Sequence, residues 1–412
     1  MSDIKHILVV SQYYWPEAFR INDMCAQWVK RGYKVTVLTG IPNYPYGSYF
    51  EGYGLFKKRR EQHDGVDIIR IPLIARGKGS VGMVLNYLSF VVSGFFWKSF
   101  TKLKADLVFN FEVSPMTQAL VGVWYARRRK IPCLLYVQDL WPENIQIVTG
   151  INSKLVLGPI GKMVDYIYRR CDRIFATSPS FVKMIEKRVP DCKERISYWP
   201  QYAEDFYQPR PKGSSPLIPD DERFKVAFTG NVGQAQGLEI LPHTAALLKE
   251  KYAHKLLFVI VGDGRSKEAL QQEIRAQGVE DMFLMIERQS AETIPDILGS
   301  ADAAFVSFMD NPLFENTIPA KLQSYMACGK AIVASASGET ERIVNEAGCG
   351  VCSPIGDAAA LAEKLEKLMH SGETVKMGEN ARAYFEKHYV RAKLLDDFDR
   401  CLEGLQGGKE YV

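Results

Sequence analysis

Short apolar runs alternate with amphipathic segments along the chain, and this alternation occurs twice. In the first half, five runs are short, branched and apolar, as in strands buried on both faces of a parallel sheet: Ile7–Val10, Val35–Leu38, Asp67–Ile71, Leu107–Asn110 and Leu134–Val137. The second half repeats the pattern at Lys225–Thr229, Leu257–Val261, Met282–Ile286, Ala303–Phe308 and Ala331–Ala334. Helical segments such as Ile21–Lys30, followed by Gly32, and Ser266–Ala276 separate the runs. The alternation predicts two sets of parallel, right-handed βαβ units.

A segment rich in Pro, Ser and Asp, Gln208–Glu222, separates the two sets and has the composition of a linker. The length of 412 residues also exceeds what one hydrophobic core usually serves. With 47% hydrophobic and 24% charged residues, the composition excludes a disordered or collagen-like chain. We therefore predict an α/β protein of two domains, the first at residues 1–205 and the second from residue 206.

Two open α/β sheets joined by a linker leave a cleft, and such sheets bind ligands beyond the carboxyl ends of their strands. A nucleotide-type ligand is therefore the first expectation. The segment after the first run, Ser11–Glu17, holds no glycine, so the dinucleotide fingerprint is missing. A Walker lysine loop is missing as well. These absences disfavour an NAD-dependent oxidoreductase and an ATPase or kinase.

The most informative segment is Pro312–Ala334. Thr317 has the character of an N-cap, Pro319 falls in the first turn, and Gly329 ends the predicted helix. Thr317, Lys321 and Ser324 would then share one helix face. Free N–H groups at a helix start together with one lysine suit a phosphate group. The alternative interpretation is a solvated helix face with a surface lysine.

Two glycine-containing loops follow predicted strands of the second domain. Phe228–Gly237 holds three glycines within eight residues, and Val261–Arg265 places an arginine after Gly-Asp-Gly. Glycine lets backbone N–H groups approach an anion closely, and a guanidinium can reach a diphosphate. Either loop taken alone could be a plain tight turn. Together with the helix at Lys321, they predict a site for a nucleotide diphosphate.

Several motifs, in their order and spacing, carry a family resemblance that covers nearly the whole chain. The motifs are SQYYWPE with RINDM at Ser11–Met24, VTVLTGIPNYPYG at Val35–Gly47, NYLSF at Asn86–Phe90, DLWPE at Asp139–Glu143, FTGNVGQAQGLE at Phe228–Glu239 and TIPAKLQSYMACGKAIVAS at Thr317–Ser335. The chain resembles bacterial retaining glycosyltransferases of family 4, of the type that assembles exopolysaccharide, O-antigen and colanic acid. The resemblance implies the GT-B fold, with two Rossmann-like domains at 1–205 and 206–387, and a C-terminal helix at about 388–412 that packs back on the first.

The resemblance also implies transfer of a sugar from a UDP-sugar with retention of configuration and without a bound metal or other cofactor. It places the donor on the second domain, at Gly230, Asn231, Gly233, Gln236, Gly262, Arg265, Arg288, Asn316, Thr317 and Ser324. It places the acceptor on the first domain, at Glu17, Arg20, Asn43, Tyr44, Glu112, Trp141 and Glu143. The expected catalytic residues are Asp139, Glu315 and Lys321.

The chain departs from the family pattern at several of these positions. Many relatives carry two glutamates eight positions apart, which here fall on Asn316 and Ser324, with Glu315 one position out of register. An arginine and a lysine that often hold the diphosphate are replaced by Asn231 and Gln236. The ribose and sugar contacts therefore cannot be carried over unchanged, and Lys321 is left as the main cation.

The reaction needs a stabilised leaving diphosphate and a face on which the acceptor hydroxyl attacks. Lys321 and nearby N–H groups would supply the first. In front-face retention, which the resemblance implies, the donor phosphate takes the acceptor proton and no protein base is obligatory. A double displacement would instead need a carboxylate nucleophile. Asp139 is favoured over Glu112 because it opens the DLWPE loop, although it could instead cap a helix.

Charge is divided unevenly between the halves. Residues 1–200 hold 29 lysines and arginines against 16 aspartates and glutamates, whereas residues 201–412 hold 23 against 32. A run of roughly 17 uncharged residues, Val81–Trp97, lies in the basic half near Lys98, Lys102 and Lys104. A membrane span would disrupt the domain, so either a helix in the core or one at the membrane interface remains, and the basic surroundings favour the interface. No motif accompanies the basic residues that would indicate nucleic-acid binding.

We accordingly expect a lipid-linked acceptor of the undecaprenyl diphosphate type and a cytoplasmic protein that is peripheral on the inner face of the cell membrane. The start of the chain lacks the features of a secretory leader, and eight scattered cysteines fit a reducing compartment. The single CxxC, Cys349 to Cys352, has no second pair at zinc spacing. Two alternative functions stay open: a UDP-sugar epimerase with the same fold, and a non-catalytic subunit of a polysaccharide assembly complex.

Overall fold

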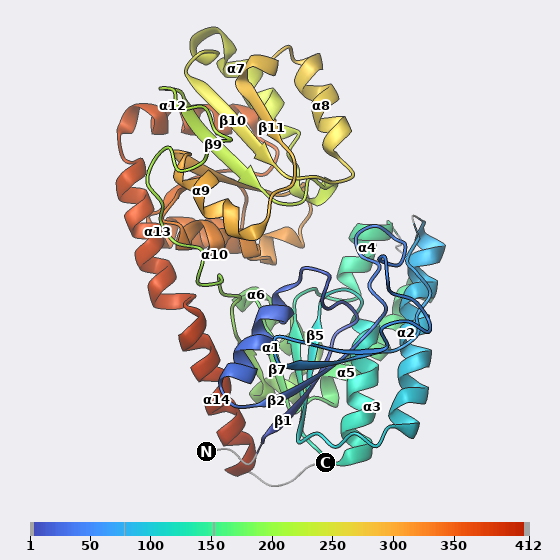
Figure 1. Ribbon diagram of the computed structural model, residues 1–412. Coiled ribbons are helices and arrows are strands. Elements are labelled where there is room, and N and C mark those ends of the chain that lie inside the picture. Colours follow the sequence, from blue (N-terminus) through green and yellow to red (C-terminus); the bar gives the residue numbers. More distant parts are fainter. Residues whose placement is uncertain (1–3, 78, 151–152, 408–412) are drawn as a thin grey trace. The chain divides into compact units, whose positions relative to one another are not determined.

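The computed structural model describes residues 4–77, 79–150 and 153–407 (Figure 1). Contacts divide the chain into two compact units, each with its own sheet; the second sheet is parallel and the first is parallel except at one edge strand. The first runs to Trp199 and also takes in the chain from Asp396 onward; the second is Pro200–Leu395. The boundaries predicted at residues 205 and 387 lie a few residues from these. Of the predicted C-terminal helix, residues 408–412 lie outside the described part of the chain.

The first unit is built on an eight-stranded sheet of order β3-β4-β2-β1-β5-β6-β7-β8. Its strands are β1 His6–Val10, β2 Lys34–Thr39, β3 Arg60–His63, β4 Val66–Arg70, β5 Leu107–Glu112, β6 Cys133–Val137, β7 Arg173–Ala176 and β8 Ile196–Tyr198. Its helices are α1 Arg20–Lys30, α2 Ser80–Phe100, α3 Ala119–Arg129, α4 Glu143–Thr149, α5 Lys154–Arg169 and α6 Pro179–Arg188, and most of α14, Arg391–Gly407, also belongs to it.

The five strands predicted for this half are confirmed to within two residues, but three strands were missed. The missed β3 has the polar sequence REQH and pairs antiparallel to β4 at the edge of the sheet. An edge strand with exposed side chains carries no apolar signal. Strands β7 and β8 have only four and three residues, which is too short for a periodic pattern.

The two faces of this sheet are covered by different helices, as β5 shows. Phe109 of β5 contacts Trp28 of α1 and Phe398 of α14, with ring centroids 4.9 and 5.6 Å away. The next residue, Asn110, points to the other face, where α3 lies so close that a Cβ on Gly122 would sit 1.9 Å from Asn110 Oδ1. Alternating strand side chains thus fix α1 and α14 on one face and α3 on the other.

Helix α2 packs on α3 and leaves one stripe of apolar side chains exposed. The side chains buried from solvent are few, Asn86, Tyr87 and Phe90 among them. The exposed apolar residues are Val81, Val84, Leu85, Leu88, Val92, Phe95, Phe96 and Phe100. By length and composition the helix could cross a membrane, and only 17% of its most apolar stretch is buried inside the protein. A helix enclosed in the core, one of the two predicted alternatives, is therefore wrong.

The second unit has a six-stranded parallel sheet of order β11-β10-β9-β12-β13-β14. Its strands are β9 Phe224–Thr229, β10 Leu256–Val261, β11 Phe283–Ile286, β12 Ala303–Ser307, β13 Ala331–Ser335 and β14 Gly350–Ser353. Its helices are α7 Ile240–Tyr252, α8 Lys267–Ala276, α9 Ile294–Gly299, α10 Ala320–Ala327, α11 Glu339–Ala347, α12 Ala358–Ser371 and α13 Thr374–His388. The strand order reverses between β9 and β12, the point where open α/β sheets bind ligands.

Helix α10 begins at Ala320, later than predicted, and Thr317 is not its N-cap. Proline disfavours the helical conformation at the residue before it, and Pro319 itself is extended, with φ −74° and ψ 138°. Thr317 instead ends a short 3-10 turn, Phe314–Asn316, and its hydroxyl donates to the carbonyl oxygen of Leu313. The polar stripe predicted on one helix face is therefore reduced to Lys321 and Ser324.

Candidate active site

The loops that follow β9, β10 and β12 meet at the carboxyl end of the second unit's sheet. Strands β9 and β10 are neighbours in this sheet. Gly230 and Gly262 follow these strands directly, and a Cβ on Gly262 would lie 1.8 Å from the carbonyl oxygen of Gly230. Gly262 also has φ +150°, which side chains rarely allow. The two loops are further joined where Val232 N–H donates to the carbonyl oxygen of Asp263 (2.9 Å). Only glycine fits this close backbone approach.

Lys321, in the first turn of α10, points to the loop after β9. Its Nζ donates to Gln236 Oε1 (2.5 Å) and lies 3.8 Å from the ring centroid of Phe228. A Cβ on Gly230 would lie 3.8 Å from the same Nζ. Burial lowers the pKa of Lys321 to about 7, because the charged ammonium loses solvation. Lys321 has no carboxylate partner among the described residues, so an incoming anion would restore the charge.

Gln236 lies at the switch point itself, between the loops after β9 and β12. Ser307, the last residue of β12, donates its hydroxyl to the carbonyl oxygen of Gln236 (2.5 Å). Met309 N–H donates to the carbonyl oxygen of Ala235 (3.1 Å). The backbone of Gln236, whose side-chain oxygen accepts the hydrogen bond from Lys321, is thus fixed to the sheet.

The other predicted donor-side residues lie at the same sheet edge but not in this cluster. Asn231, Arg265 and Arg288 have exposed side chains, and they follow β9, β10 and β11 respectively. Gly233 lies against Asn231, whose Nδ2 would be 2.5 Å from an added Cβ. These flexible side chains are free to adjust to a ligand, whereas Lys321 is held.

Residues 315–317 form the turn before α10. Glu315 is exposed, and its carbonyl oxygen would lie 2.0 Å from a Cβ on Gly338, so the backbone of the turn is pinned to the start of α11. Asn316 donates to the carbonyl oxygen of Pro312 (3.1 Å). Ser324 is buried and donates to the carbonyl oxygen of Ala320 on its own helix (3.3 Å). Glu315 is the acidic side chain of this turn that reaches solvent.

In the first unit, Asp139 lies in the loop after β6. Its Oδ2 accepts a hydrogen bond from the backbone N–H of Ser114 (2.8 Å), in the loop after β5. The Ser114 hydroxyl in turn accepts from Trp141 Nε1 (3.0 Å) and Asn144 Nδ2 (2.7 Å). Glu143, the first residue of α4, lies 3.9 Å from an Arg188 guanidinium nitrogen. Ser114 had no motif signal in the sequence, although it connects these side chains.

Glu112 was predicted on the acceptor side, and the structure does not place it in reach of an acceptor. It is the last residue of β5 and is fully buried. Burial and the nearby Asp139 raise the pKa of Glu112 well above its ordinary value. The N–H of Asp139 contacts Glu112 Oε2 (3.4 Å). Glu112 therefore supports the loop of Asp139 from the interior of the domain.

Glu17 was also predicted to contact the acceptor, but its carboxylate is occupied by the protein backbone. One oxygen accepts the N–H groups of Asn43 (2.8 Å) and Tyr44 (2.7 Å), and the other accepts that of Tyr14 (3.2 Å). Burial nevertheless raises the pKa of Glu17 to about 7. Glu17 therefore acts as a clamp that joins the loops after β1 and β2. Arg20, also predicted, is the partly buried first residue of α1.

Asn43 and Tyr44 differ in exposure. Asn43 is fully buried, and its Oδ1 accepts from the N–H of Arg76 (3.0 Å) and from Asn86 Nδ2 (3.3 Å). Tyr44 is 37% exposed and packs on Tyr13, with ring centroids 5.5 Å apart. Tyr44 is thus open to a ligand, while Asn43 holds its loop.

A buried amide network beneath these loops was not predicted. Gln12 Nε2 donates to Asn86 Oδ1 (2.7 Å), and the backbone N–H of Gln12 donates to Gln118 Oε1 (2.5 Å). Asn86 also donates to the carbonyl oxygen of Ile74 (2.6 Å). The available signal was Asn86 itself, a polar residue inside an otherwise apolar run. The network ties α2 to the loops after β1 and β4.

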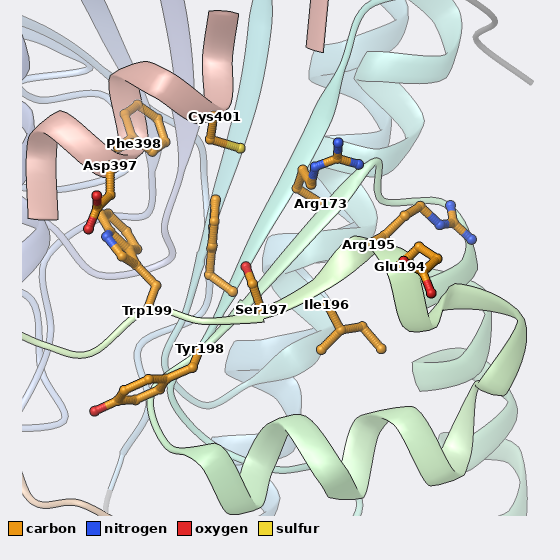
Figure 2. A pocket seen from close by; sticks show the side chains of 11 residues that line it. Arg173, Glu194, Arg195, Ile196, Ser197, Tyr198, Trp199, Asp397, Phe398 and Cys401 are labelled. Atoms are coloured by element: carbon orange, nitrogen blue, oxygen red, sulfur yellow. The ribbon is translucent and has the colours of Figure 1, made fainter. Parts of the chain in front are cut away.

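No group of three or more His, Cys, Asp and Glu side chains within residues 4–77, 79–150 and 153–407 is arranged to hold a metal ion. Three cavities of the first unit are lined by no predicted site residue. Figure 2 shows one of about 250 Å³ beneath α14, where Arg173, Arg195 and Cys401 lie among its lining side chains.

Comparison with known proteins agrees with both units. A glycosyl transferase 4-like domain matches residues 18–196, and the family described as glycosyl transferases group 1 matches residues 211–384. The chain is 25% identical over 423 residues to the putative colanic acid biosynthesis glycosyl transferase WcaI of Escherichia coli K12, covering 97% of this chain and 100% of WcaI. It is 26% identical over 282 residues to the probable glycosyltransferase WbjE of Pseudomonas aeruginosa, covering 66% and 68% of the two chains.

Solved structures show the same fold at low identity. Sucrose-phosphate synthase from Thermosynechococcus elongatus superposes with a TM-score of 0.77 at 16% identity, over 98% of this chain and 100% of that one. HepE from Anabaena, in complex with UDP and glucose, gives a TM-score of 0.71 at 15% identity, over 97% and 100%. With both halves matched and the double parallel-sheet architecture on view, the chain belongs to the bacterial family 4 glycosyltransferases with the GT-B fold.

Proposed function

We propose that this glycosyltransferase moves a sugar, an N-acetylhexosamine or a deoxyhexose, from a UDP-sugar to a lipid-linked glycan of the undecaprenyl diphosphate type during synthesis of a surface polysaccharide. The transfer retains the anomeric configuration. The observation that carries the donor half of the proposal is Lys321, half-buried beside Gln236 and Gly230 at the switch point of the second sheet. The names of WcaI and WbjE support the polysaccharide context.

The donor diphosphate would lie against Lys321 and the N–H groups of the glycine loops. As the bond to the sugar breaks, negative charge builds on the leaving phosphate, and a lysine that is already fixed stabilises it without reorganisation. Arg265 and Arg288 can close on the diphosphate and the base because they are exposed and lie at the same sheet edge. Glu315, in the turn before α10, would contact the sugar.

The acceptor half of the proposal rests on the loops of the first unit. The hydroxyl of the acceptor would approach between Asp139 and Tyr44, with Glu143 and Arg20 around it. Trp141, predicted on the acceptor side, is buried and donates to Ser114, so it holds the loop of Asp139 rather than the acceptor. In front-face retention, its proton passes to the donor phosphate, and Asp139 stabilises the positive charge that develops on the sugar. These groups need no metal ion. We therefore expect turnover to be unchanged by a chelator.

The enzyme would work at the cytoplasmic face of the membrane, with the exposed apolar stripe of α2 in the lipid interface. Apolar side chains of this kind, flanked by lysines, bind anionic bilayers by area and by charge. The protein should sediment with anionic liposomes at low salt and be released at high salt. Val92→Glu on the stripe should weaken sedimentation, whereas Leu247→Glu, an exposed leucine of α7, should not. Binding to neutral vesicles alone would contradict the proposal.

The decisive experiment is a nucleotide-release screen across UDP- and GDP-sugars, with and without a lipid-linked acceptor. Release of UDP that depends on the acceptor, with a product of retained configuration, would support the proposal. An epimerase would form a free epimer without acceptor. A chain that binds no nucleotide in a thermal-shift panel would be a non-catalytic subunit.

A further inference from the structure

A groove of about 1140 Å³ lies in the first unit between α2 and the β3-β4-β2 end of the sheet. It is larger than the other two cavities, and no residue of the candidate active site lines it. Its lining comes from β2, β3 and β4, from the last two turns of α2, and from the chain that follows α2. The cavity in Figure 2 is a weaker candidate, because Arg195 and Arg173 there already donate to the carbonyl oxygens of Cys171 and Asp172.

The groove exists because α2 docks on α3 and not on the outer strands. A Cβ on Gly94 of α2 would lie 2.3 Å from a methyl carbon of Val121 of α3. The Val121 side chain therefore packs directly on the backbone of α2 at Gly94. Ring contacts continue the seam, with Trp97 and Tyr125 centroids 5.5 Å apart. The face of the outer strands that α2 would otherwise cover is left partly exposed at Asp67 and Ile69 of β4.

The two walls of the groove differ in chemistry. The wall from α2 is apolar and aromatic, with Phe96, Trp97 and Phe100. The floor follows the strand register: Thr36 pairs with Asp67, and Asp67 with Gln62. Gln62 Nε2 donates to Asp67 Oδ1 (3.1 Å), which satisfies part of the floor internally. A ligand that fits both walls must be amphiphilic.

The charge around the groove is mainly positive. Lys34, Arg59, Arg60 and Lys102 line it, against Glu61 and Asp67. Glu61 forms an ion pair with Arg70. Among the described residues, Lys34, Arg60 and Lys102 take part in no ion pair. The open cations therefore favour an anionic amphiphile.

The groove is connected to the acceptor side through α2. Asn86 on this helix bonds to Asn43, and Phe100 is 14 residues further on, which is about 21 Å along a helix. Arg60 pairs with Ile69 near the carboxyl end of β4, the same sheet edge as the acceptor loops. Lys34 begins β2, at the opposite edge. The groove thus runs from the acceptor edge of the sheet to its far edge.

We propose that this groove binds the prenyl chain of a polyprenyl diphosphate, the carrier part of the lipid-linked acceptor. The diphosphate lies at Arg60, while the Arg59 guanidinium stays bonded to the carbonyl oxygens of Arg70 and Leu55, and the chain runs along Phe96 and Trp97 toward Phe100. The inference rests on the proposed function and adds to it a binding site that holds the carrier lipid on the protein. In this arrangement Phe96 and Phe100, the stripe residues that line the groove, contact the carrier, and the rest of the exposed stripe of α2 contacts the bilayer.

The test uses geranylgeranyl diphosphate, below its micellar concentration, as a probe titrated into the full-length protein by calorimetry. Ser93→Trp puts an indole into the groove and should weaken binding about tenfold or more, because it takes the space of the chain. Leu247→Trp adds the same ring to an exposed position of α7, outside the groove and the stripe, and should leave the affinity unchanged. Arg60→Ala should weaken binding more than Lys102→Ala, because the diphosphate lies at the Arg60 end. Circular dichroism checks that each variant is folded.

The opposing outcomes are distinct. Equal binding of inorganic diphosphate would reduce the site to a simple anion site and overturn the proposal. Equal competition by dihexanoyl-phosphatidylglycerol would assign the groove to a bilayer phospholipid instead. If the probe does not bind while UDP still does, the carrier site is wrong and the proposed transferase function stands. If the wild-type protein does not bind UDP, the result would instead count against the proposed function.

Discussion

The carboxyl ends of the two sheets are built in opposite ways. In the first unit, the loops are held by buried side chains whose hydrogen bonds are largely made inside the protein, such as Glu17, Asn43 and Asn86. In the second unit, the loops are held by close backbone contacts at Gly230 and Gly262. The donor-side residues there include exposed side chains, such as Asn231 and Arg265, and the half-buried Lys321, which donates to one amide.

The difference separates positioning from binding. A buried carboxylate that already accepts three N–H groups has little left to offer a ligand, so the first unit shapes its loops and leaves contact to residues such as Tyr44 and Asp139. In the second unit, the N–H groups of Gly230 and Gly262 also donate within the protein, to the carbonyl oxygens of Val261 (2.9 Å) and Ile286 (3.0 Å), so contact with a ligand is left to Lys321 and to exposed side chains such as Arg265. Mutations should therefore affect mainly stability in the first case and mainly nucleotide affinity in the second.

The largest effect is expected at Lys321. Lys321→Ala removes the half-buried cation of the donor cluster and should lower the rate of UDP-sugar turnover by about 100-fold or more. Folding should be retained, since the lysine makes only one hydrogen bond within the described structure. Nucleotide-release kinetics measure the effect. Lys364→Ala, an exposed lysine of α12, is the control. Equal rates in both variants would remove Lys321 from the donor site.

Asp139→Asn tests the one carboxylate of the first unit that we place at the reaction. Asparagine keeps an oxygen for the N–H of Ser114, so the loop should stay in place while the charge is lost. We expect turnover to fall by about 100-fold with unchanged UDP affinity. Wild-type turnover would exclude Asp139 from catalysis.

The pH dependence of unfolding tests whether Glu17 of the first unit acts on stability. Its folded pKa, about 7, lies above the ordinary value, so the folded state binds the extra proton between about pH 4.5 and 7. Stability should therefore fall as pH rises through this window, by roughly 3 kcal/mol at most, and level off above it. Glu17→Gln cannot titrate and should lose this part of the pH dependence. Urea unfolding at pH 5 and pH 8 measures both proteins. Parallel changes in the two would contradict the buried, titrating carboxylate.

The smallest effect concerns the pH dependence of UDP binding. Lys321 loses its proton above about pH 7 in the free protein, and a bound diphosphate raises its pKa again. The affinity for UDP should therefore fall as pH rises from 7 to 8.5, by no more than about tenfold per pH unit, with uptake of a proton. Calorimetry in buffers of different ionisation enthalpy detects that proton. Lys321→Arg stays charged and should bind UDP without this slope.

The sequence carried the framework of both units because their central strands are continuous apolar runs, such as Leu257–Val261 in β10. It missed β3, whose four side chains are polar or exposed at a sheet edge. It placed the start of α10 too early, because Thr317 has the character of a cap while Pro319 decides the local backbone. Local patterns thus located strands better than helix starts.

The candidate site was predictable only in part. Lys321 and Gln236 are 85 positions apart, and their contact follows from the topology of the sheet, which the family resemblance supplied. The amino-acid sequence alone does not distinguish a carboxylate that faces an acceptor from one that is buried. Glu17 and Glu112 were for this reason predicted on the acceptor side. The amide network of Gln12 and Asn86 depends on how α2 meets three loops, which no local pattern encodes.

The last helix has a consequence for how the chain is made. Phe398 of α14 stacks on Trp28 and Trp199, with ring centroids 4.8 and 5.7 Å away, and Arg31 pairs with Asp399. These contacts belong to the first unit, yet they arrive about 200 residues after Trp199 leaves the ribosome, roughly 10–40 s later at ordinary rates of synthesis. Until then the aromatic cluster of the nascent first unit lacks its cover. Premature termination anywhere in the second half would therefore leave a chain with two incomplete units, both exposing apolar surface to chaperones and proteases.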